Sequence, residues 1–149
     1  MVYYQLAINS TVQLKGPAPT DSVIVIQSSS LETHPSASSG FDNTHINLKN
    51  ANGDILLTIA PRFSQNAIVF NSRTVNGNWG PEEREVLEGK FKTDTPSIVI
   101  YEHPDRYQVF FDFNPVKYYD KRIQGPTASV EYAINKETEY VYRVMSFEK

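Results

Sequence analysis

The chain alternates short apolar runs with polar breaks. Runs rich in Val, Ile, Tyr, Phe and Thr are cut by Gly, Pro, Asn or Asp about every ten residues, without a helical repeat. This pattern predicts an all-β protein whose strands form two packed antiparallel sheets. The expected strands lie near 2–8, 11–15, 22–29, 44–49, 54–60, 66–73, 83–87, 97–102, 106–112, 116–122, 128–134 and 139–147.

Three successive segments combine a core face with a polar face. Successive side chains of a strand point to opposite sides of the sheet, and one side must be buried. In DILLTIAPR and AIVFNSR, the residues expected in the core are Ile55, Leu57, Ile59, Ile68 and Phe70. Four polar groups face outward instead, namely Arg62, Asn71, Glu82 and Arg84. Adjacent strands lie ~5 Å apart, so these groups converge if the strands pair in sequence order.

The only tryptophan, Trp79, lies in the polar stretch NWGPEER. An indole is by default a packing residue because it buries a large apolar area. Here Gly80 and Pro81 break the strand and allow the ring to stand over the polar surface. A sugar requires this combination, because its C–H bonds pack on an aromatic ring while its hydroxyls hydrogen-bond to charged groups. The pattern therefore predicts a carbohydrate-binding surface.

Length and composition narrow the function classes. The 149 residues are expected to form one domain, spanning 1–149. A net charge of -3 and the lack of a basic patch disfavour nucleic acid and anionic membranes as partners. The N-terminus lacks the features of a signal peptide, and no run is long enough to span a bilayer, so a cytoplasmic protein without membrane insertion is expected. Without cysteine there are no disulfides or thiolate metal ligands.

The segment 54–85, DILLTIAPRFSQNAIVFNSRTVNGNWGPEERE, resembles the carbohydrate-recognition signature of galectins. That signature runs His-x-Asn-x-Arg, then Val-x-Asn, then Trp-x-x-Glu-x-Arg. The sequences of the later segments EHPDRYQVFFDF and YYDKRI are similar to those of fungal galectins. The resemblance implies a galectin-type jelly-roll β-sandwich that binds β-galactosides without metal, cofactor or catalysis. It also implies a homodimer or homotetramer, with glycoprotein or glycolipid glycans as partners. Some members are exported without a signal peptide, so an extracellular location is the alternative to the cytoplasm.

The resemblance also implies a role for each matching residue. Trp79 stacks on the apolar face of the sugar, and Asn71 binds its primary hydroxyl. Arg62 reaches the ring oxygen and a neighbouring hydroxyl. Glu82 bridges hydroxyls on adjacent sugars and holds the arginines, while Arg84 reaches the second sugar.

Two positions depart from the galectin signature. Thr58 and Ala60 stand where galectins place the His and Asn that read the axial 4-hydroxyl of galactose. Leaving a ligand hydroxyl unpaired costs roughly 1–3 kcal/mol, or about one to two powers of ten in affinity. We therefore expect weak or absent lactose binding, and a pocket widened above Thr58 and Ala60 for a different sugar or a 4-substituent. The long Ser-rich loop 28–44 is expected at the edge of the groove.

Two other classes of function stay open. A jelly-roll glycosidase would need a pair of carboxylates on either side of one bond. Glu82 and Glu83 are adjacent on a strand and face opposite ways, which disfavours an enzyme. The second alternative is a galectin-like structural or interaction protein that has lost sugar binding. Retention of the five signature residues argues against that alternative.

The remaining candidates receive structural interpretations. Scattered histidines disfavour a zinc or iron site, and all three are expected in loops or turns: His34, His45 and His103. A small basic cluster is expected to form a solvated sheet edge: Lys117, Lys121 and Arg122. Glu102 and Asp105 are expected at a solvated hairpin end.

Overall fold

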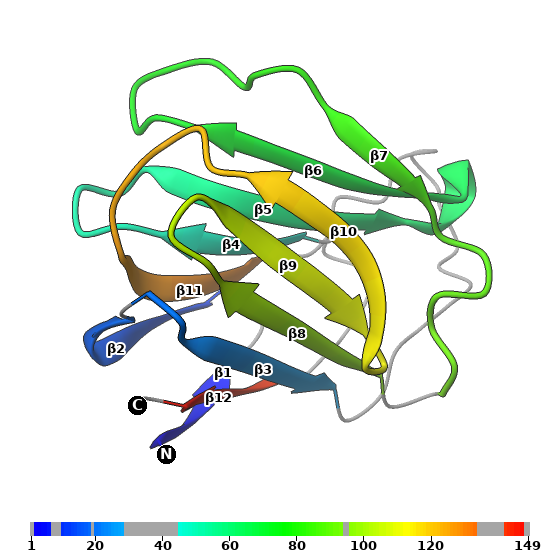
Figure 1. Ribbon diagram of the computed structural model, residues 1–149, viewed down its shortest axis with the longest axis horizontal. Coiled ribbons are helices and arrows are strands. Elements are labelled where there is room, and N and C mark those ends of the chain that lie inside the picture. The colour runs from blue at the N-terminus through cyan, green and yellow to red at the C-terminus, as the bar shows by residue number, and fades with distance from the viewer. Residues whose placement is uncertain are drawn as a thin grey trace.

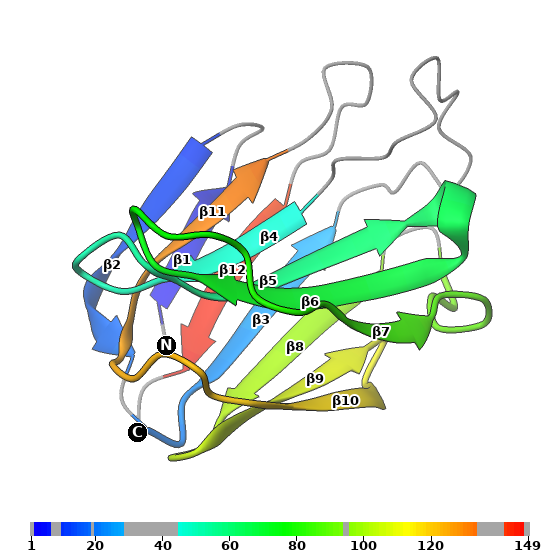
Figure 2. The ribbon, with the colours of Figure 1, turned by 90° about the horizontal axis from the view of Figure 1, so that it is seen from above.

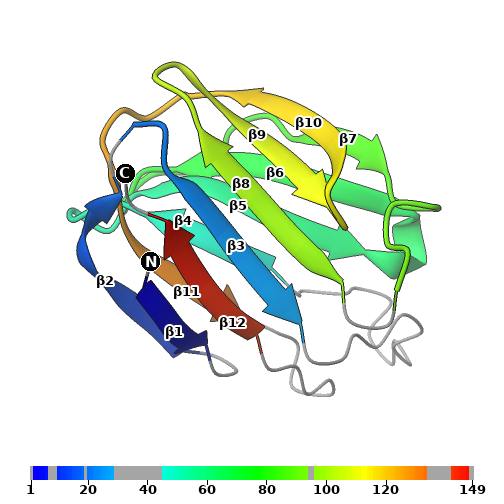
Figure 3. The same cartoon turned by 60° about the horizontal axis from the view of Figure 1, so that its bottom comes forward.

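Two antiparallel sheets make up the part of the chain described by a computed structural model, which covers residues 2–6, 10–18, 20–28, 45–93, 96–133 and 142–147 (Figure 1). Sheet 1 has the spatial order β1 (Val2–Leu6), β12 (Tyr142–Phe147), β3 (Val23–Ser28), β8 (Ser97–Glu102), β9 (Arg106–Phe111), β10 (Asn114–Asp120). Sheet 2 has the order β2 (Ser10–Ala18), β11 (Thr127–Ala133), β4 (His45–Lys49), β5 (Ile55–Arg62), β6 (Ala67–Arg73), β7 (Glu83–Val86). Figure 3 shows β1, β12, β3, β8 and β9 following one another across the nearer layer.

This architecture confirms the predicted all-β sandwich of two antiparallel sheets. Each expected strand is present, and the differences are confined to strand ends, of which the expected positions 7–8, 29, 44, 134 and 139–141 lie outside the described residues. A short 3-10 helix, Phe63–Gln65, was not predicted; it joins β5 to β6 and ends at Asn66, whose φ of 48° is left-handed. Asparagine tolerates that conformation better than most residues do. The expected loop 28–44 lies outside the described residues, apart from Ser28 at the end of β3.

The hydrophobic core lies between the two sheets and follows the alternation read from the sequence. Leu57, Ile59, Ile68 and Phe70 are fully buried, as predicted. Sheet 1 contributes inward residues of the same kind, including Ile24, Ile26, Ile98, Ile100, Tyr107, Val109 and Phe111. Strict alternation would place Leu56 on the outer face, yet it is also fully buried. The pairing of β5 with β6 shifts register between residues 55 and 58, which allows two consecutive leucines to enter the core.

A buried ion pair lies where the chain crosses from sheet 1 to sheet 2. Lys121 follows β10, and its Nζ lies 3.0 Å from Oε1 of Glu102, with side chains 4% and 2% exposed. Thr127, at the start of β11, donates its hydroxyl to the other carboxylate oxygen at 3.3 Å. The expectation that Lys121 and Glu102 are solvated was wrong, because the β10–β11 connection passes over the end of β8 (Figure 2).

Burial raises the pKa of Glu102, and the hydrogen bond and charge of Lys121 oppose that rise. We expect Lys121→Met to lower the free energy of unfolding by about 3–5 kcal/mol at pH 7, because it leaves a buried carboxylate without its partner. A carboxyl with a raised pKa in the folded state favours folding when protonated, and this contribution is lost as pH rises. The loss of unfolding free energy caused by Lys121→Met should therefore be smaller at pH 5 than at pH 7 when both are measured by urea unfolding.

The double variant Lys121→Met/Glu102→Gln is the control for that measurement. It removes both charges, so its unfolding free energy should lie closer to the wild-type value and show less pH dependence than that of Lys121→Met. Equal losses for Lys121→Met at both pH values would contradict this account of the ion pair.

Candidate functional site

A cavity of about 360 Å³ opens on the outer face of sheet 2. Its wall comes from β4, β5, β6 and the connection between β6 and β7, and consists of His45, Thr58, Ala60, Arg62, Val69, Asn71, Trp79, Gly80 and Glu82. Every residue predicted for the site lies in this wall except Arg84, which contacts Glu82 directly. The predicted residues are therefore brought together around one cavity.

Strand pairing explains why these side chains meet. Thr58 on β5 lies opposite Asn71 on β6, and the next pair along, Ile59 with Phe70, points into the core. Alternation then returns Ala60 to the cavity wall. Burial of the apolar pair thus determines which residues face outward.

Asn71 has its amide held in one orientation. It is only 4% exposed, and its Oδ1 accepts hydrogen bonds from the backbone N–H of Ser72 at 2.8 Å and from Nη1 of Arg122 at 2.9 Å. Its Nδ2 donates to the carbonyl of Gly80 at 2.8 Å. Since an amide nitrogen carries two hydrogens, one N–H remains for a ligand in the cavity.

Glu82 lies between two arginines at the rim of the cavity. Its Oε2 accepts from Nη2 of Arg84 at 2.7 Å and from Nε at 3.1 Å, and its Oε1 lies 3.4 Å from Nη2 of Arg62. Nη1 of Arg84 donates to Oε1 of Gln65 at 3.1 Å. The hydrogen bond from Arg84 and then the charge of Arg62 hold the pKa of Glu82 below its ordinary value. Glu82 and its two arginines therefore offer a ligand charged donors and an ionised acceptor side by side.

Trp79 forms an apolar part of the wall. The residue is 44% exposed, and the guanidinium carbon of Arg73 lies 4.9 Å from the ring centroid. The chain reaches it through a turn closed by Gly77 N–H donating to the Thr74 carbonyl at 2.9 Å, and Gly80 N–H then donates to the Ser72 carbonyl at 3.3 Å. A partly exposed aromatic ring beside directional polar groups is suited to bind a ligand with both apolar and hydroxylated faces.

Comparison with known proteins identifies the family. The family model for galactoside-binding lectins matches residues 9–144. The chain belongs to the galectin family. Galectin-1 of Coprinopsis cinerea is 41% identical over 130 residues, which cover 87% of this chain and 83% of that protein. The anti-tumor lectin of Cyclocybe aegerita is 35% identical over 138 residues, covering 91% and 87% of the two chains.

The fold comparison agrees with the family. The crystal structure of galectin LEC-6 from Caenorhabditis elegans matches with a TM-score of 0.71 at 17% sequence identity, covering 97% of this chain and 96% of that one. Sheep Galectin-11, in complex with glycerol, matches with a TM-score of 0.73 at 15% identity, covering 95% and 99%. These likenesses establish the galectin-type jelly roll.

His45 is a residue of this galectin cavity that the sequence interpretation missed. Its interpretation as a loop or turn residue was wrong, because His45 begins β4 and lines the cavity, whereas the strand expected near 44–49 is present. The pairing of Ile46 with Ile59 places His45 beside Ala60 on the same outer face. A signal was present, since HINLK alternates polar with apolar residues as β5 and β6 do. His103, by contrast, follows β8 in a turn, as expected, and His34 lies outside the described residues.

The surroundings of Arg122 also differ from those predicted. This residue was expected on a solvated sheet edge, but its guanidinium donates to Asn71, to the Pro81 carbonyl and to Glu83, and its side chain is 27% exposed. Lys117 is likewise engaged, with its Nζ 3.1 Å from Glu83 and its side chain 14% exposed. These cations pair with carboxylates of β7 because the edges of the two sheets lie close together there.

Two negative findings concern the described ranges alone. Within them, no group of three or more His, Asp or Glu side chains is arranged to hold a metal ion. The same ranges contain no helix with the length and apolar character that crossing a bilayer requires.

The arrangement around Glu82 makes a prediction that needs no ligand. In an NMR titration of side-chain carboxyls, Glu82 should titrate below the ordinary glutamate value, and Arg84→Met should raise its pKa more than Arg62→Met does. The reason is that Arg84 supplies the largest stabilisation of the ionised form. If Arg62→Met had the larger effect, Arg84 would not be the main partner of Glu82.

Proposed function

We propose that this galectin is a lectin that binds β-galactoside-related glycans in the cavity of sheet 2, through one carbohydrate-recognition domain spanning 1–149. Binding requires no metal or cofactor, and the protein does not catalyse a reaction. The observation that carries the proposal is the convergence of Arg62, Asn71, Trp79 and Glu82 on a single cavity, with Arg84 hydrogen-bonded to Glu82.

Each side chain has a role that matches its surroundings. Trp79 presents its ring to the C–H face of a sugar, and the remaining N–H of Asn71 binds the primary hydroxyl. Arg62 donates to the ring oxygen and a neighbouring hydroxyl. Glu82 accepts from hydroxyls of adjacent sugars, and Arg84 reaches the second sugar.

The contacts of the two adjacent glutamates support a binding function over hydrolysis. Glu82 contacts Arg62 and Arg84 on the cavity side, whereas Glu83 contacts Lys117 and Arg122 on the other side of β7. A glycosidase needs two carboxyl groups flanking one bond. Carboxylates held on opposite sides of a strand do not meet that requirement.

We further propose that the sugar preference differs from that of galectins carrying the full signature. Thr58 and Ala60 are short, so they leave space above β5, and they lack the imidazole and amide that read an axial 4-hydroxyl. His45 enters the same cavity from the neighbouring strand. This arrangement favours a sugar with a 4-substituent or a different stereochemistry over a free galactoside.

Assembly and location follow from the family resemblance. We propose a homodimer or homotetramer, because several weak sites on one assembly gain avidity for glycoprotein or glycolipid glycans. We propose a cytoplasmic location, with an extracellular location, reached as in galectins that are exported without a signal peptide, as the alternative. Nucleic acid is not a partner, and the protein binds glycans without membrane insertion.

A glycan array probed with the wild type and with Trp79→Ala tests the function. We expect a defined set of glycans to bind the wild type, and Trp79→Ala to weaken that binding at least about tenfold, since it removes the stacking ring. Tyr118→Ala is the matched control, because Tyr118 is 50% exposed but lies outside the cavity. A wild type that binds nothing, or equal losses for the two variants, would favour an interaction protein that has lost sugar binding.

Thr58→His tests the account of specificity. Restoring the imidazole should supply a hydrogen bond to the axial 4-hydroxyl worth roughly 1–3 kcal/mol, so calorimetry should show lactose affinity rising about tenfold or more. Thr58→Val, which adds no donor, should show no gain. Unchanged lactose affinity in Thr58→His would mean that Thr58 does not set the preference.

A further inference from the structure

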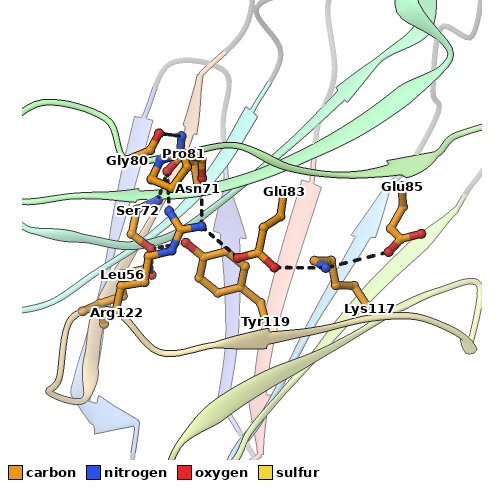
Figure 4. A network of polar contacts seen from close by, with 10 residues as sticks. All are labelled: Leu56, Asn71, Ser72, Gly80, Pro81, Glu83, Glu85, Lys117, Tyr119 and Arg122. Carbon is orange, nitrogen blue, oxygen red and sulfur yellow. Dashed lines mark hydrogen bonds and ion pairs between the residues drawn. The ribbon is translucent and has the colours of Figure 1, made fainter.

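Arg122 links the two sheets beside the cavity (Figure 4). It follows β10 of sheet 1, yet its guanidinium reaches three acceptors in or next to strands of sheet 2. Nη1 donates to Oδ1 of Asn71 at 2.9 Å, and Nη2 donates to the Pro81 carbonyl and to Oε2 of Glu83, both at 2.8 Å. One side chain therefore holds β6, the β6–β7 connection and β7 together.

The guanidinium itself rests on an anchored ring. Its carbon lies 5.0 Å from the ring centroid of Tyr119, a fully buried residue of β10. The Tyr119 hydroxyl shares a hydrogen bond of 2.6 Å with Oγ of Ser72, which donates to the Leu56 carbonyl at 2.8 Å. Because a hydroxyl has one hydrogen to give, Tyr119 is the donor to Ser72. The Tyr119 ring under Arg122 is thus tied to β6 through Ser72 and, through the same hydroxyl, to β5.

Arg122 and the Ser72 N–H together fix the orientation of the Asn71 amide. Both donate to Oδ1, so a flipped amide would place its NH2 group against two donors. The observed orientation turns Nδ2 toward the carbonyl of Gly80, a residue that lines the cavity beside Asn71. The donor proposed to bind a sugar hydroxyl therefore depends on a residue that is not part of the cavity wall.

Gly80 shows how closely the guanidinium approaches the segment that carries the site. A Cβ built on Gly80 would lie 2.8 Å from Nη1 of Arg122 and 3.4 Å from Oδ1 of Asn71. A side chain at position 80 would have to displace the guanidinium. Since Gly80 and Pro81 join Trp79 to Glu82, the position of Arg122 bears on both of those residues.

We infer that Arg122 is a positioning residue of the binding site: without lining the cavity, it sets glycan affinity by holding the Asn71 amide and the segment 79–82 in place. The inference rests on the proposed function for its affinity readout. Its geometric part, the placement of segment 79–82, can be measured without any sugar.

The first test compares Arg122→Met with Lys117→Met. Lys117 also contacts Glu83, at 3.1 Å, but the cavity wall does not include it, so its loss removes a cation without touching Asn71 or Pro81. Binding to galactose-terminated polyacrylamide, whose many copies of the sugar make a weak single-site affinity measurable through avidity, should weaken about tenfold in Arg122→Met and stay at the wild-type level in Lys117→Met. Arg122→Lys should not rescue binding, because an ammonium cannot reproduce the planar fork that serves several acceptors.

A second readout uses the only tryptophan in the chain. Acrylamide quenching of Trp79 fluorescence should change in Arg122→Met and not in Lys117→Met, at a temperature where circular dichroism shows both variants folded. A purely structural role would lower the melting temperature and leave the quenching of the folded protein unaltered. Unchanged affinity or unchanged quenching in Arg122→Met overturns the inference, as does an equal effect of Lys117→Met.

Gly80→Ala provides a variant that retains Arg122. The added methyl group displaces the end of a flexible side chain, so the protein should fold while showing the weakened binding and altered quenching of Arg122→Met. In the double variant Gly80→Ala/Arg122→Met, the effects of the two substitutions on binding and quenching should be clearly less than additive. The reason is that the guanidinium that the methyl group displaces is already gone. Additive effects would overturn the inference.

Failure of the proposed function has a different signature. If the wild type binds no galactose-terminated or other glycan while Arg122→Met still alters Trp79 quenching, the lectin function is wrong and the placement of segment 79–82 by Arg122 stands. If the wild type binds and both readouts are unaffected by Arg122→Met, the lectin function stands and the positioning role is wrong.

Discussion

The alternation of side chains along β5 and β6 is the constraint on which the site depends. Ile59 and Phe70 are fully buried between the sheets, and the residues on either side of them must therefore face outward. A slip of one residue would expose the core set and bury the polar one, so hydrophobic burial fixes the register and with it the placement of Thr58 and Asn71. Stability and binding are thus properties of opposite faces of the same strands.

This constraint explains how much could be predicted from the sequence. The strands and the grouping of Arg62, Asn71 and Glu82 follow from periodicity in segments that are consecutive in the chain and adjacent in sheet 2. Arg122 escaped prediction because its place depends on segments distant in sequence, whereas His45 was missed although β4 and β5 are consecutive in the chain and HINLK carries the same alternation. Arg122 acts across the sandwich, from the β10–β11 crossover onto β6, and local alternation carries no information about such contacts.

The charges around β7 organise geometry more than they stabilise the fold. Glu82 is paired toward the cavity with Arg84, and Glu83 is paired away from it with Arg122 and Lys117. Partly exposed pairs of this kind contribute little to unfolding free energy, typically about 0–1 kcal/mol. Their effect is on orientation. Each carboxylate is held by cations on its own side of the strand, and the arginine donors at the rim of the cavity are held in turn by Glu82.

The position of His45 changes what a ligand must span. Adjacent strands are separated by about 4.8 Å, so the imidazole of His45 on β4 lies one spacing farther from β6 than a side chain on β5 does. A ligand that contacts both His45 on β4 and Asn71 on β6 has to extend across β5, roughly 10 Å for two spacings. A single pyranose ring is narrower than that, whereas a disaccharide or a substituted sugar is wide enough. Thr58 and Ala60, between these two groups, have short side chains and line the same cavity. Under the proposed function, this arrangement suits a disaccharide or a substituted sugar better than a free galactose.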